Sequence, residues 1–400
     1  MSPPSPKAPF LELIPTAGEI RRGDTTDVYF RRTMEVLRAA GKDRVRVAAE
    51  GFVKGFPAGY PFAILSGMDE MLSLLSGLEV DVDAMEEGRL FLTEEPVFTV
   101  EGPYGAFCEM ETAMLGMLCQ ATGIATASAR LKHAAGAKAL LSFGARRMHP
   151  ALSTMIDRSA FVGGADSVSV LRSAEFLGDP PQGTMPHALV LVFGDTVEAM
   201  RAFDATIDPE VPRVCLIDTL QDEKFEALRV AEALEGKLSA VRLDTPASRK
   251  GSFRKILEEV RWELDLRGFG SVRLYASGGL GEADVRALSD VADGFGVGTA
   301  ISNAPTVDFA LDIVEVEGTP LAKRGKRSGR KQARVCPFCG KRDVLPAEAP
   351  AKSCCGGPME PLLLPAIRAG RAVREPFPPR EIRERVLRQV ARFHAPTEGK

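Results

Sequence analysis

The strongest constraint on the fold is an alternation of apolar runs and amphipathic stretches over residues 137–299. Five runs of strand type occur there: AKALLSFG, PRVCLID, SAVRLD, SVRLYASGG and DGFGVGT. Helical patterns such as DEKFEALRVAEALEG and SFRKILEEVRWELDLRG lie between them. Strands that alternate with helices at this spacing pair in parallel. The sequence therefore predicts a parallel α/β sheet, either open or closed into a barrel.

The flanking segments have different patterns. Short β-type runs punctuated by Gly and Pro accompany one helical stretch at 66–77, which predicts an α+β sandwich domain. A long Ala-rich helical stretch then leads into the βα units. The expected divisions are a disordered arm (1–14), the α+β domain (15–115), the barrel (116–305), a basic return segment or linker (306–334), a cysteine module (335–362), and a C-terminal helix and tail (363–400).

Charge and hydropathy exclude some classes of protein. Lys and Arg number 51 against 54 Asp and Glu, so no overall basic field attracts nucleic acid or an anionic membrane. The N-terminal residues have no apolar signal core, and no stretch approaches the roughly 18 apolar residues of a membrane span. We expect a cytoplasmic protein whose anion sites are local.

Polar residues gather where the predicted strands end, which is where parallel α/β folds place their chemistry. Two glycine-containing loops, SGGLGEADVRAL and GFGVGT, join a strand to a helix and offer free backbone N–H groups to a phosphate. Arg242 and Asp244 alternate at another strand end and could supply a cation and a carboxylate for sugar hydroxyls. The alternatives are turn formers and helix caps for the loops and an internal ion pair for Arg242 and Asp244. The set as a whole predicts a phosphorylated ligand.

His187 is the histidine best placed for chemistry, in the segment GDPPQGTMPHALV. A ring held there could act as a nucleophile or an acid/base, although a lone histidine is more often structural. Periodicity leaves the following ALVLVF open between strand and helix. If GTM is a short strand, His187 lies at the catalytic rim; if ALVLVF is the strand, His187 lies at the opposite end.

Four of the seven cysteines cluster near the C-terminus, in CPFCG and CCGGP. The spacing of Cys336 and Cys339 is typical of a zinc knuckle. Cys354 and Cys355 are adjacent, so both can bind one ion only with an irregular backbone, and the fourth ligand stays open. The sequence predicts a structural Zn²⁺ site.

The basic run at 323–334 has two interpretations. It could be a solvated linker, or its lysines (Lys323, Lys326 or Lys331) could capture a diphosphate. It contains no aromatic residues on which bases could stack, which disfavours single-stranded nucleic acid as the ligand.

Several motifs in order resemble the nicotinate phosphoribosyltransferase family, especially its archaeal-type branch, over roughly residues 15–335. They are FGARRMHP, GGADSVSV, GTMPH, LIDTLQDE, VRLDTPASRKG, EVRWELDLRG, ASGGL and FGVGT. The resemblance implies the type II phosphoribosyltransferase fold, an irregular α/β barrel with an N-terminal sandwich domain. It also implies the transfer of a 5-phosphoribosyl group from 5-phosphoribosyl 1-diphosphate to nicotinate, with ATP hydrolysis coupled through a phosphohistidine. Diphosphate departure would need a cation-lined site, with Mg²⁺ as the expected metal.

By this resemblance, His187 corresponds to the phosphohistidine and Asp218 to the carboxylate that orients it. Phe143 corresponds to the ring stacked on the pyridine, and Tyr29 to the opposite ring, contributed by a partner subunit. A homodimer, or a larger homo-oligomer, with shared active sites follows. The remaining substrate-binding residues would be Arg146 and Arg242 for nicotinate or the phosphates, Asp166 and Ser167 at the pyridine pocket, Asp244 for the ribose hydroxyls, and Gly278, Gly279, Gly298 and Thr299 for the 5-phosphate. The resemblance does not assign the family's lysines uniquely within the basic run, where Lys323 and Lys326 are our candidates for the diphosphate.

Three other functions stay open from the sequence. A quinolinate phosphoribosyltransferase would share the barrel, but it needs no histidine phosphorylation. A nicotinamide-specific enzyme would differ at a few pocket residues, and an arginine favours the carboxylate of nicotinate over that neutral amide. A nucleic-acid-binding protein would use the zinc knuckle and the basic run, but the net negative charge of the chain disfavours this function.

Overall fold

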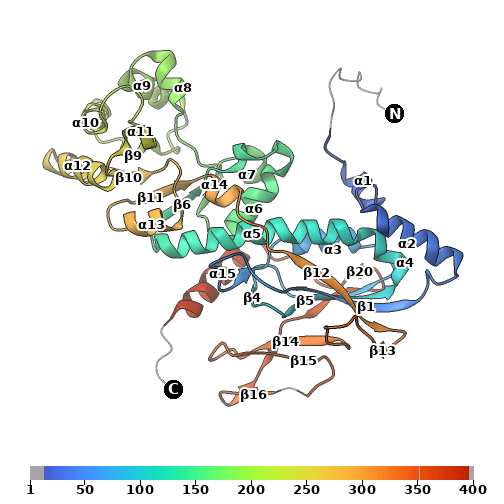
Figure 1. Ribbon diagram of the computed structural model, residues 1–400. Helices are drawn as coiled ribbons and strands as arrows, with labels where there is room; N and C mark the ends of the chain where they lie inside the picture. The colour runs from blue at the N-terminus through green and yellow to red at the C-terminus, as the bar shows by residue number, and fades with distance from the viewer. Residues whose placement is uncertain (1–12, 351, 396–400) are drawn as a thin grey trace, which may run out of the picture.

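The computed structural model describes residues 13–350 and 352–395, so the arm expected at 1–14 lies almost wholly outside the described residues. Two units make up the molecule: a half-barrel of βα units and a sandwich built on an antiparallel sheet (Figure 1). The long helix α5 (Glu111–Ala135) runs between them and contacts both. Within the described residues, no helix combines the length and apolar character that a membrane crossing requires.

The half-barrel contains six parallel strands in the order β7-β6-β11-β10-β9-β8, which confirms the predicted parallel sheet. Five strands match the predicted runs, whereas β7 was not predicted. The strands are β6 (Ala139–Ser142), β7 (Ser167–Val168), β8 (Arg213–Leu216), β9 (Leu238–Leu243), β10 (Arg273–Ala276) and β11 (Gly294–Val297).

The sheet does not close into the expected barrel. In the part of the chain that the structure describes, β7 and β8 form its two edges, and residues 179–186 between them contain no strand. Three prolines in this segment lack the N–H that a ladder needs. Among the described residues, the Gln182 N–H is the one donor of this segment that bonds to a neighbouring strand, at the Val168 carbonyl. The prolines therefore give a physical reason for the open edge.

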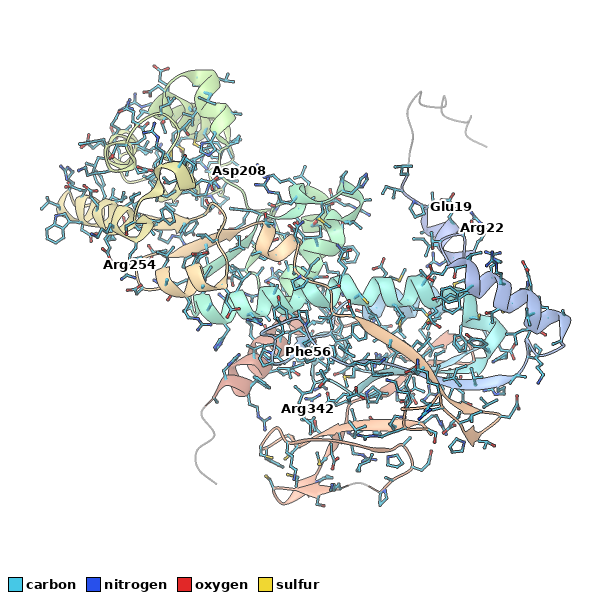
Figure 2. All side chains as sticks on the ribbon, viewed as in Figure 1. Glu19, Arg22, Phe56, Asp208, Arg254 and Arg342 are labelled. Atoms are coloured by element: carbon cyan, nitrogen blue, oxygen red, sulfur yellow. The ribbon has the colours of Figure 1, made fainter. Side chains whose placement is uncertain are left out.

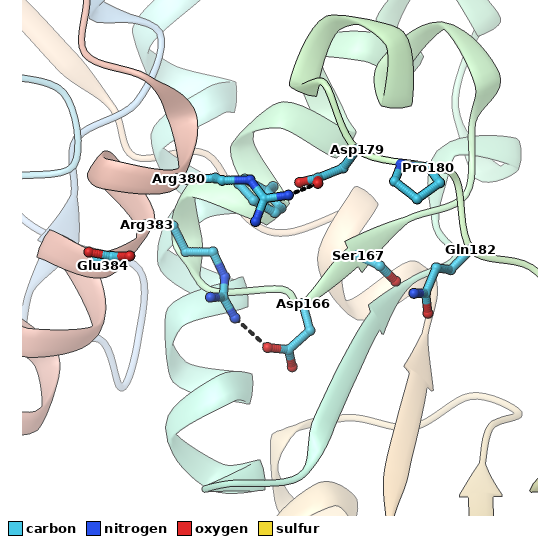
Figure 3. Close-up of a pocket in the computed structure, with 9 residues that line it drawn as sticks. Asp166, Ser167, Asp179, Pro180, Gln182, Arg380, Arg383 and Glu384 are labelled. Atoms are coloured by element: carbon cyan, nitrogen blue, oxygen red, sulfur yellow. Dashed lines mark hydrogen bonds and ion pairs between the residues drawn. The ribbon is translucent and has the colours of Figure 1, made fainter. Parts of the chain in front are cut away.

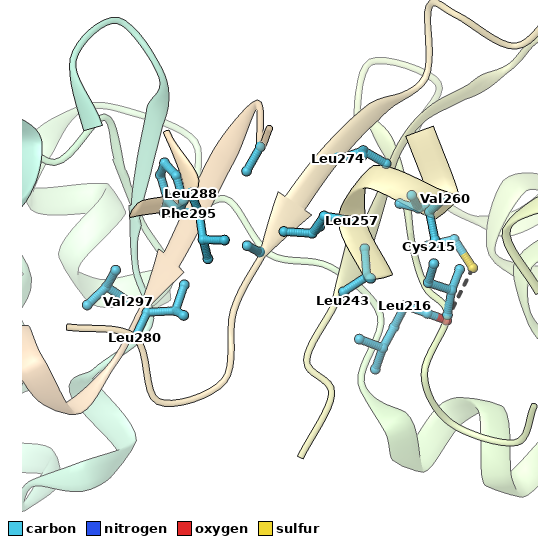
Figure 4. Close-up of a cluster of buried hydrophobic side chains, with 14 of the residues drawn as sticks. Cys215, Leu216, Leu243, Leu257, Val260, Leu274, Leu280, Leu288, Phe295 and Val297 are labelled. Atoms are coloured by element: carbon cyan, nitrogen blue, oxygen red, sulfur yellow. Dashed lines mark hydrogen bonds between the residues drawn. The ribbon is translucent and has the colours of Figure 1, made fainter. Parts of the chain in front are cut away.

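Alternate residues of each strand face opposite sides of the sheet, so the two faces have separate cores. Cys215, Leu274 and Phe295 pack against the covering helices, as Figure 4 shows. Leu141 and Tyr275 belong to a smaller cluster on the inner face. The helices of this unit are α6 (Ser153–Gly163), α7 (Leu171–Leu177), α8 (His187–Phe193), α9 (Thr196–Thr206), α10 (Glu223–Ala233), α11 (Ala247–Lys250), α12 (Phe253–Leu266), α13 (Glu282–Leu288) and α14 (Thr299–Ser302).

The sandwich takes strands from both ends of the chain. Its seven-stranded sheet has the order β13-β12-β1-β5-β3-β19-β20. The strands are β1 (Arg46–Val53), β3 (Asp81–Ala84), β5 (Pro96–Pro103), β12 (Phe309–Val316), β13 (Thr319–Pro320), β19 (Leu364–Arg368) and β20 (Arg371–Ala372). The segment 306–334 is therefore not simply a linker, because β12 pairs along β1, and the expected tail at 363–400 supplies two more strands.

Smaller elements complete the sandwich. The helix expected at 66–77 is α3, and the two-stranded pair β2–β4 lies near it in the chain. Their bounds, with those of the N-terminal helices, are α1 (Ala17–Arg21), α2 (Val28–Ala39), α3 (Met68–Leu75), α4 (Tyr104–Phe107), β2 (Ala63–Ile64) and β4 (Leu90–Phe91).

Helix α5 is Ala-rich because it is covered on all sides. Residues 121–129 are all buried, so no face of this stretch can carry a long side chain. A Cβ on Gly123 would lie 2.3 Å from the Pro305 carbonyl oxygen, and one on Gly163 of α6 would lie 2.2 Å from that of Ala125. The small residues thus allow the close packing that joins the two units.

The cysteine module extends the sandwich. It contains a three-stranded sheet, and Arg342 of this sheet forms an ion pair with the buried Glu95 (2.6 Å; Figure 2 labels Arg342). The C-terminal helix, predicted at 379–393, packs against α5 and α6. The bounds are β14 (Lys331–Val335), β15 (Arg342–Pro346), β16 (Ser353–Cys354), β17 (Gly357–Pro358), β18 (Glu360–Pro361) and α15 (Pro379–His394).

Candidate active site

The inner face of the half-barrel ends in polar groups at the carboxyl ends of its strands. Phe143 follows β6 and packs against the inner-face cluster, and Gly296 of β11 provides the space for its ring. A Cβ on Gly296 would lie 2.5 Å from Phe143 Cε2. We call this edge of the sheet, at the carboxyl ends of its strands, the rim. The Phe143 ring is held at the rim because its neighbour Gly296 has no side chain.

Arg242 of β9 lies beside this ring, with its guanidinium carbon 5.8 Å from the Phe143 centroid. Its Nη1 donates to Ser277 Oγ (3.3 Å) and lies 3.6 Å from Asp244 Oδ2. Burial lowers the pKa of Arg242 from its usual value, and the negative charge of Asp244 opposes that shift. The guanidinium is thus a partly desolvated cation at the rim, suited to an anionic group.

Asp244 is held by its neighbours. Its Oδ1 lies 3.2 Å from Ser277 Oγ. A Cβ on Gly278 would lie 3.0 Å from the same oxygen, so the chain passes close to the carboxylate. Asp244 is fixed at the mouth of the sheet, facing Arg242 on one side and His187 on the other.

His187 is the first residue of α8, so ALVLVF is a helix, one of the two structures that its periodicity left open, and GTM before it is not a strand. Its Nδ1 lies 3.0 Å from Thr219 Oγ1, and its Nε2 lies 3.7 Å from Asp244 Oδ2. The side chain is 41% exposed. His187 therefore lies at the carboxyl ends of the strands, oriented by Thr219 and open to solvent.

Asp218 precedes Thr219 at the end of β8. Both its carboxylate oxygens are buried, and neither has a well-formed hydrogen bond within the described residues. Burial raises the pKa of Asp218, and the charge of His187 acts in the opposite direction. A buried carboxylate without partners is costly unless a cation or proton neutralises it. Asp218 is available for a positively charged group at the rim.

The two predicted glycine loops lie at neighbouring strand ends. Gly278 and Gly279 follow β10 with φ of +92° and +72°, which favours glycine. Gly298 follows the adjacent β11 and is the N-cap of the short α14, which begins at Thr299. The structure thus brings both loops to the same rim as Arg242 and His187.

Comparison with known proteins decides the family. The family models for the quinolinate phosphoribosyl transferase N-terminal and C-terminal domains match residues 27–122 and 124–312. The nicotinate phosphoribosyltransferase pncB2 of Mycobacterium tuberculosis is 31% identical over 329 residues, covering 78% of this chain and 68% of its own. The chain belongs to the nicotinate phosphoribosyltransferase family. It is an enzyme of this type.

Solved structures share the fold of this chain. The crystal structure of nicotinate-nucleotide pyrophosphorylase from Pyrococcus furiosus is 51% identical, with a TM-score of 0.93 over 96% of this chain and 98% of its own. Human nicotinic acid phosphoribosyltransferase, at 20% identity, shares the fold with a TM-score of 0.76 over 92% of this chain and 94% of its own. NadC from Streptococcus pyogenes, at 15% identity, matches less well, with a TM-score of 0.54 over 76% of this chain and all of its own.

Not every residue expected at the site of this family member lies at the rim. Arg146 lies in the short 3-10 helix after β6, and its charge influences Arg242. Asp166 and Ser167 lie at the amino end of β7 instead. Asp166 forms ion pairs with Lys132 (2.8 Å) and Arg383, and it accepts a hydrogen bond from the Leu140 N–H. In this structure these contacts hold Asp166 away from the rim.

Tyr29, Lys323 and Lys326 lie on the sandwich, not at the rim of their own chain. Tyr29 is 56% exposed on α2, and Figure 1 shows α2 on the opposite side of the molecule from α8. Lys323 and Lys326 both form ion pairs with the buried Asp312. Burial raises the pKa of nearby Glu111 to about 7, with Asp312 adding to the shift. The three residues therefore belong to a charged surface on the sandwich.

The structure distinguishes among the lysines of the basic run. Lys331 is saturated, because its Nζ contacts Glu50 (2.9 Å) and the carbonyls of Arg327 and Gly329. Lys326 is mostly covered and lies 4.0 Å from the Phe52 ring centroid. Lys323 is 62% exposed, which makes it the most available lysine of the three.

The four clustered cysteines come together. Their Sγ atoms all lie within 4.8 Å of one another, with 3.6 Å between Cys339 and Cys354 and 3.8 Å between Cys354 and Cys355. Cys355 has φ of +52°, the irregular backbone that two adjacent ligands require. The donor set fits a tetrahedral metal ion, since four ligands about 2.3 Å from Zn²⁺ would be separated by about 3.8 Å.

One residue beneath the rim was missed by the sequence reasoning. Asp157 of α6 is fully buried, and it accepts hydrogen bonds from Ser142 Oγ (3.0 Å) and the Val170 N–H (3.3 Å). It thereby ties the ends of β6 and β7 to a helix. An aspartate inside a helical pattern carries no motif, so no signal in the sequence could have identified it.

Proposed function

We propose that the enzyme joins nicotinate to 5-phosphoribosyl 1-diphosphate, giving nicotinate mononucleotide and diphosphate. The observation that carries this proposal is the convergence of His187, Asp218, Arg242 and Phe143 on one rim, beside two glycine loops. The relatives named as nicotinate phosphoribosyltransferases support the choice of substrate.

The rim residues suit the transfer chemically. The pyridine nitrogen attacks C1 of the ribose, and the C1–O bond to diphosphate breaks with both electrons leaving on oxygen. Positive charge develops on the ribosyl group, so positioning and electrostatic stabilisation matter more than a protein nucleophile. Phe143 would stack on the pyridine, Asp244 would take the ribose hydroxyls, and the loops Gly278–Gly279 and Gly298–Thr299 would bind the 5-phosphate.

Selection of nicotinate over nicotinamide would come from arginine. The guanidinium of Arg242 lies beside the Phe143 ring, where a carboxylate on a stacked pyridine could reach it. Arg146 is the second candidate. A charge-assisted, bidentate contact is available to a carboxylate but not to a neutral amide.

We further propose that ATP hydrolysis drives the reaction through His187. The γ-phosphoryl group of ATP would pass to a ring nitrogen, with ADP leaving, and water would later release phosphate. Thr219 and Asp244 hold the ring, and Asp218 would stabilise its charged form. The exposure of the ring leaves room for a phosphoryl donor.

Two metals belong to the proposal. Asp218 and Asp244 carry the carboxylates at the rim that could hold Mg²⁺, which would neutralise charge on the departing diphosphate. Cys336, Cys339, Cys354 and Cys355 would hold a structural Zn²⁺. Figure 1 shows the strands β14 to β16 of the cysteine module on the far side of the sandwich from the half-barrel, so the zinc would stabilise the fold without joining the chemistry.

We propose a homodimer in which each sandwich completes the partner's rim. Tyr29, Lys323 and Lys326 resemble substrate-binding residues, yet they lie on the sandwich, away from their own His187. A second subunit could bring them to the rim, with Tyr29 opposite Phe143 and Lys323 near the diphosphate.

Quinolinate is the second candidate substrate. The matching family models are those of quinolinate phosphoribosyl transferase, and the similar Pyrococcus furiosus protein is named a nicotinate-nucleotide pyrophosphorylase. The experiment is mononucleotide formation from nicotinate, nicotinamide and quinolinate, with and without ATP, by wild type and by His187→Ala. We expect product from nicotinate, stimulated by ATP only in wild type. Full ATP stimulation of His187→Ala would refute the role of His187.

A further inference from the structure

A polar cavity lies beside the edge strand β7, between the half-barrel and the C-terminal helix (Figure 3). Its volume is about 250 Å³. The polar residues that line it include Asp166, Ser167, Asp179, Gln182, Arg380 and Arg383. We name it the α15 pocket. Asp166 and Ser167 mark the amino end of β7, so the pocket is distinct from the rim at the carboxyl ends.

Ser167 carries an unused hydroxyl at this pocket. The residue is only 9% exposed, and its Oγ is buried without a hydrogen-bond partner among the described residues. A buried hydroxyl left unpaired costs stability. A ligand in the α15 pocket could supply the missing partner.

Arg383 is held in place by hydrogen bonds through Nε and Nη2, which leaves the N–H groups of Nη1 as possible donors to a ligand. Its Nε donates to the Ala165 carbonyl (2.9 Å), and its Nη2 donates to the Gly164 carbonyl (3.1 Å) and to Asp166. Guanidinium has five N–H donors, so both hydrogens of Nη1 remain without a hydrogen bond to the described chain. Arg380 is 68% exposed, and its one hydrogen-bond partner among the described residues is Asp179, through Nη2.

The carboxylates of the α15 pocket, by contrast, are already matched. Asp166 is paired with Lys132 and Arg383, and Asp179 with Arg380. Glu384 is 66% exposed and lies 3.7 Å from Arg388. The capacity left in the pocket is therefore donor capacity, which suits an acceptor-rich anion.

We propose that the α15 pocket is a second binding site, separate from catalysis, for a small anion with a carboxylate or phosphate group. Arg380 and the Nη1 of Arg383 would bind the anion, and Ser167 Oγ would donate to it. The volume limits the ligand to a molecule at or below the lower end of ordinary ligand pockets, about 300 Å³.

An anion bound in the α15 pocket would also affect residues 179–186, the segment that leads into His187. Asp179 begins the irregular segment 179–186, which is anchored to Arg380 at its start and to the Val168 carbonyl through Gln182. An anion that recruits Arg380 would weaken the hold on Asp179. This consequence rests on the proposed role of His187, whereas the binding site does not.

Equilibrium dialysis of the full chain with inorganic phosphate tests the site. The probe is titrated with 5-phosphoribosyl 1-diphosphate present in excess, so that the rim is filled. Wild type should bind one phosphate per chain under these conditions, and Ser167→Ala and Arg380→Gln should each weaken that binding at least tenfold. Arg388→Gln, a 71% exposed arginine of the same helix that does not line the pocket, should bind as wild type does.

A parallel titration with acetate separates carboxylates from phosphates as the preferred group, and tight binding of either supports the site. The proposal fails if wild type binds neither anion with the rim filled, or if Ser167→Ala and Arg380→Gln bind like wild type. Nicotinate transfer by the same variants is measured separately. Loss of the site with transfer retained, or absence of transfer with the site present, distinguishes this proposal from the proposed function.

Discussion

Gly296→Ala should remove much of the activity by displacing Phe143. The added Cβ would lie 2.5 Å from Cε2 and 2.6 Å from Cδ2 of the ring. Ordinary carbon contacts are about 3.5–4.0 Å, so the ring must move by roughly 1 Å. A displacement of that size at a positioned group costs about 10²-fold in rate. We expect kcat/KM for nicotinate to fall about 100-fold, and the free energy of unfolding to fall by about 1–3 kcal/mol from overpacking.

Gly294→Ala is the matched control for this variant. It lies two residues earlier on the same strand, and its Cβ would lie 2.9 Å from the buried Tyr275 ring. Overpacking occurs there too, but the added Cβ meets Tyr275 and Ala139 and not the Phe143 ring itself. Steady-state kinetics with nicotinate and urea unfolding are measured on both variants. If Gly296→Ala loses no more kcat/KM than Gly294→Ala, Phe143 is not the platform for the pyridine.

Four further predictions follow from the contacts. Thr219→Val leaves His187 Nδ1 without its partner at 3.0 Å, so stimulation by ATP should fall roughly two- to tenfold, with transfer in the absence of ATP unchanged in the same assay. Arg158→Ala strands the buried Glu87, so chemical denaturation should show a loss of about 3–5 kcal/mol; a loss below 1 kcal/mol would contradict the pairing. Burial raises the pKa of Asp69 to about 7, so ionisation disfavours the folded state, and the stability of Asp69→Asn relative to wild type should grow as pH rises from about 4 to about 7 and then level off. Metal analysis should find one zinc per chain, lost more readily to a chelator from Cys355→Ser, with a lower Tm after removal.

The parallel core was predictable because its signals are local. Five of the six strands of the half-barrel are short apolar runs beside amphipathic helices, and the sequence predicts these five. The sixth, β7, has only two residues, Ser167 and Val168, and follows a glycine pair. The sheet stays open because the prolines of residues 179–186 cannot donate hydrogen bonds to a neighbouring strand, and which strands they separate is not visible in the local sequence. The C-terminal strands of the sandwich pair with segments almost 300 residues earlier in the chain, as when Leu364 pairs with Ala84, and no local pattern specifies such pairing.

The site was predictable where it follows strand ends. Arg242 and Asp244 meet Ser277 because neighbouring parallel strands end together. His187 was harder, because its place depends on a segment without regular structure. Asp166 shows why a role cannot be assigned from a motif alone. The family resemblance assigned it to the pyridine pocket, but its side chain forms ion pairs with Lys132 and Arg383, which come from helices distant in the sequence.

Transfer of a phosphoribosyl group to nicotinate is the activity that we propose for the enzyme. The most direct test is to incubate the purified full chain with nicotinate, 5-phosphoribosyl 1-diphosphate, Mg²⁺ and ATP, and to quantify nicotinate mononucleotide by mass spectrometry, with quinolinate and nicotinamide in parallel. We predict that nicotinate is converted to nicotinate mononucleotide and that diphosphate is released in an equal amount. Product from quinolinate alone, or no mononucleotide from nicotinate under any condition, would contradict the account.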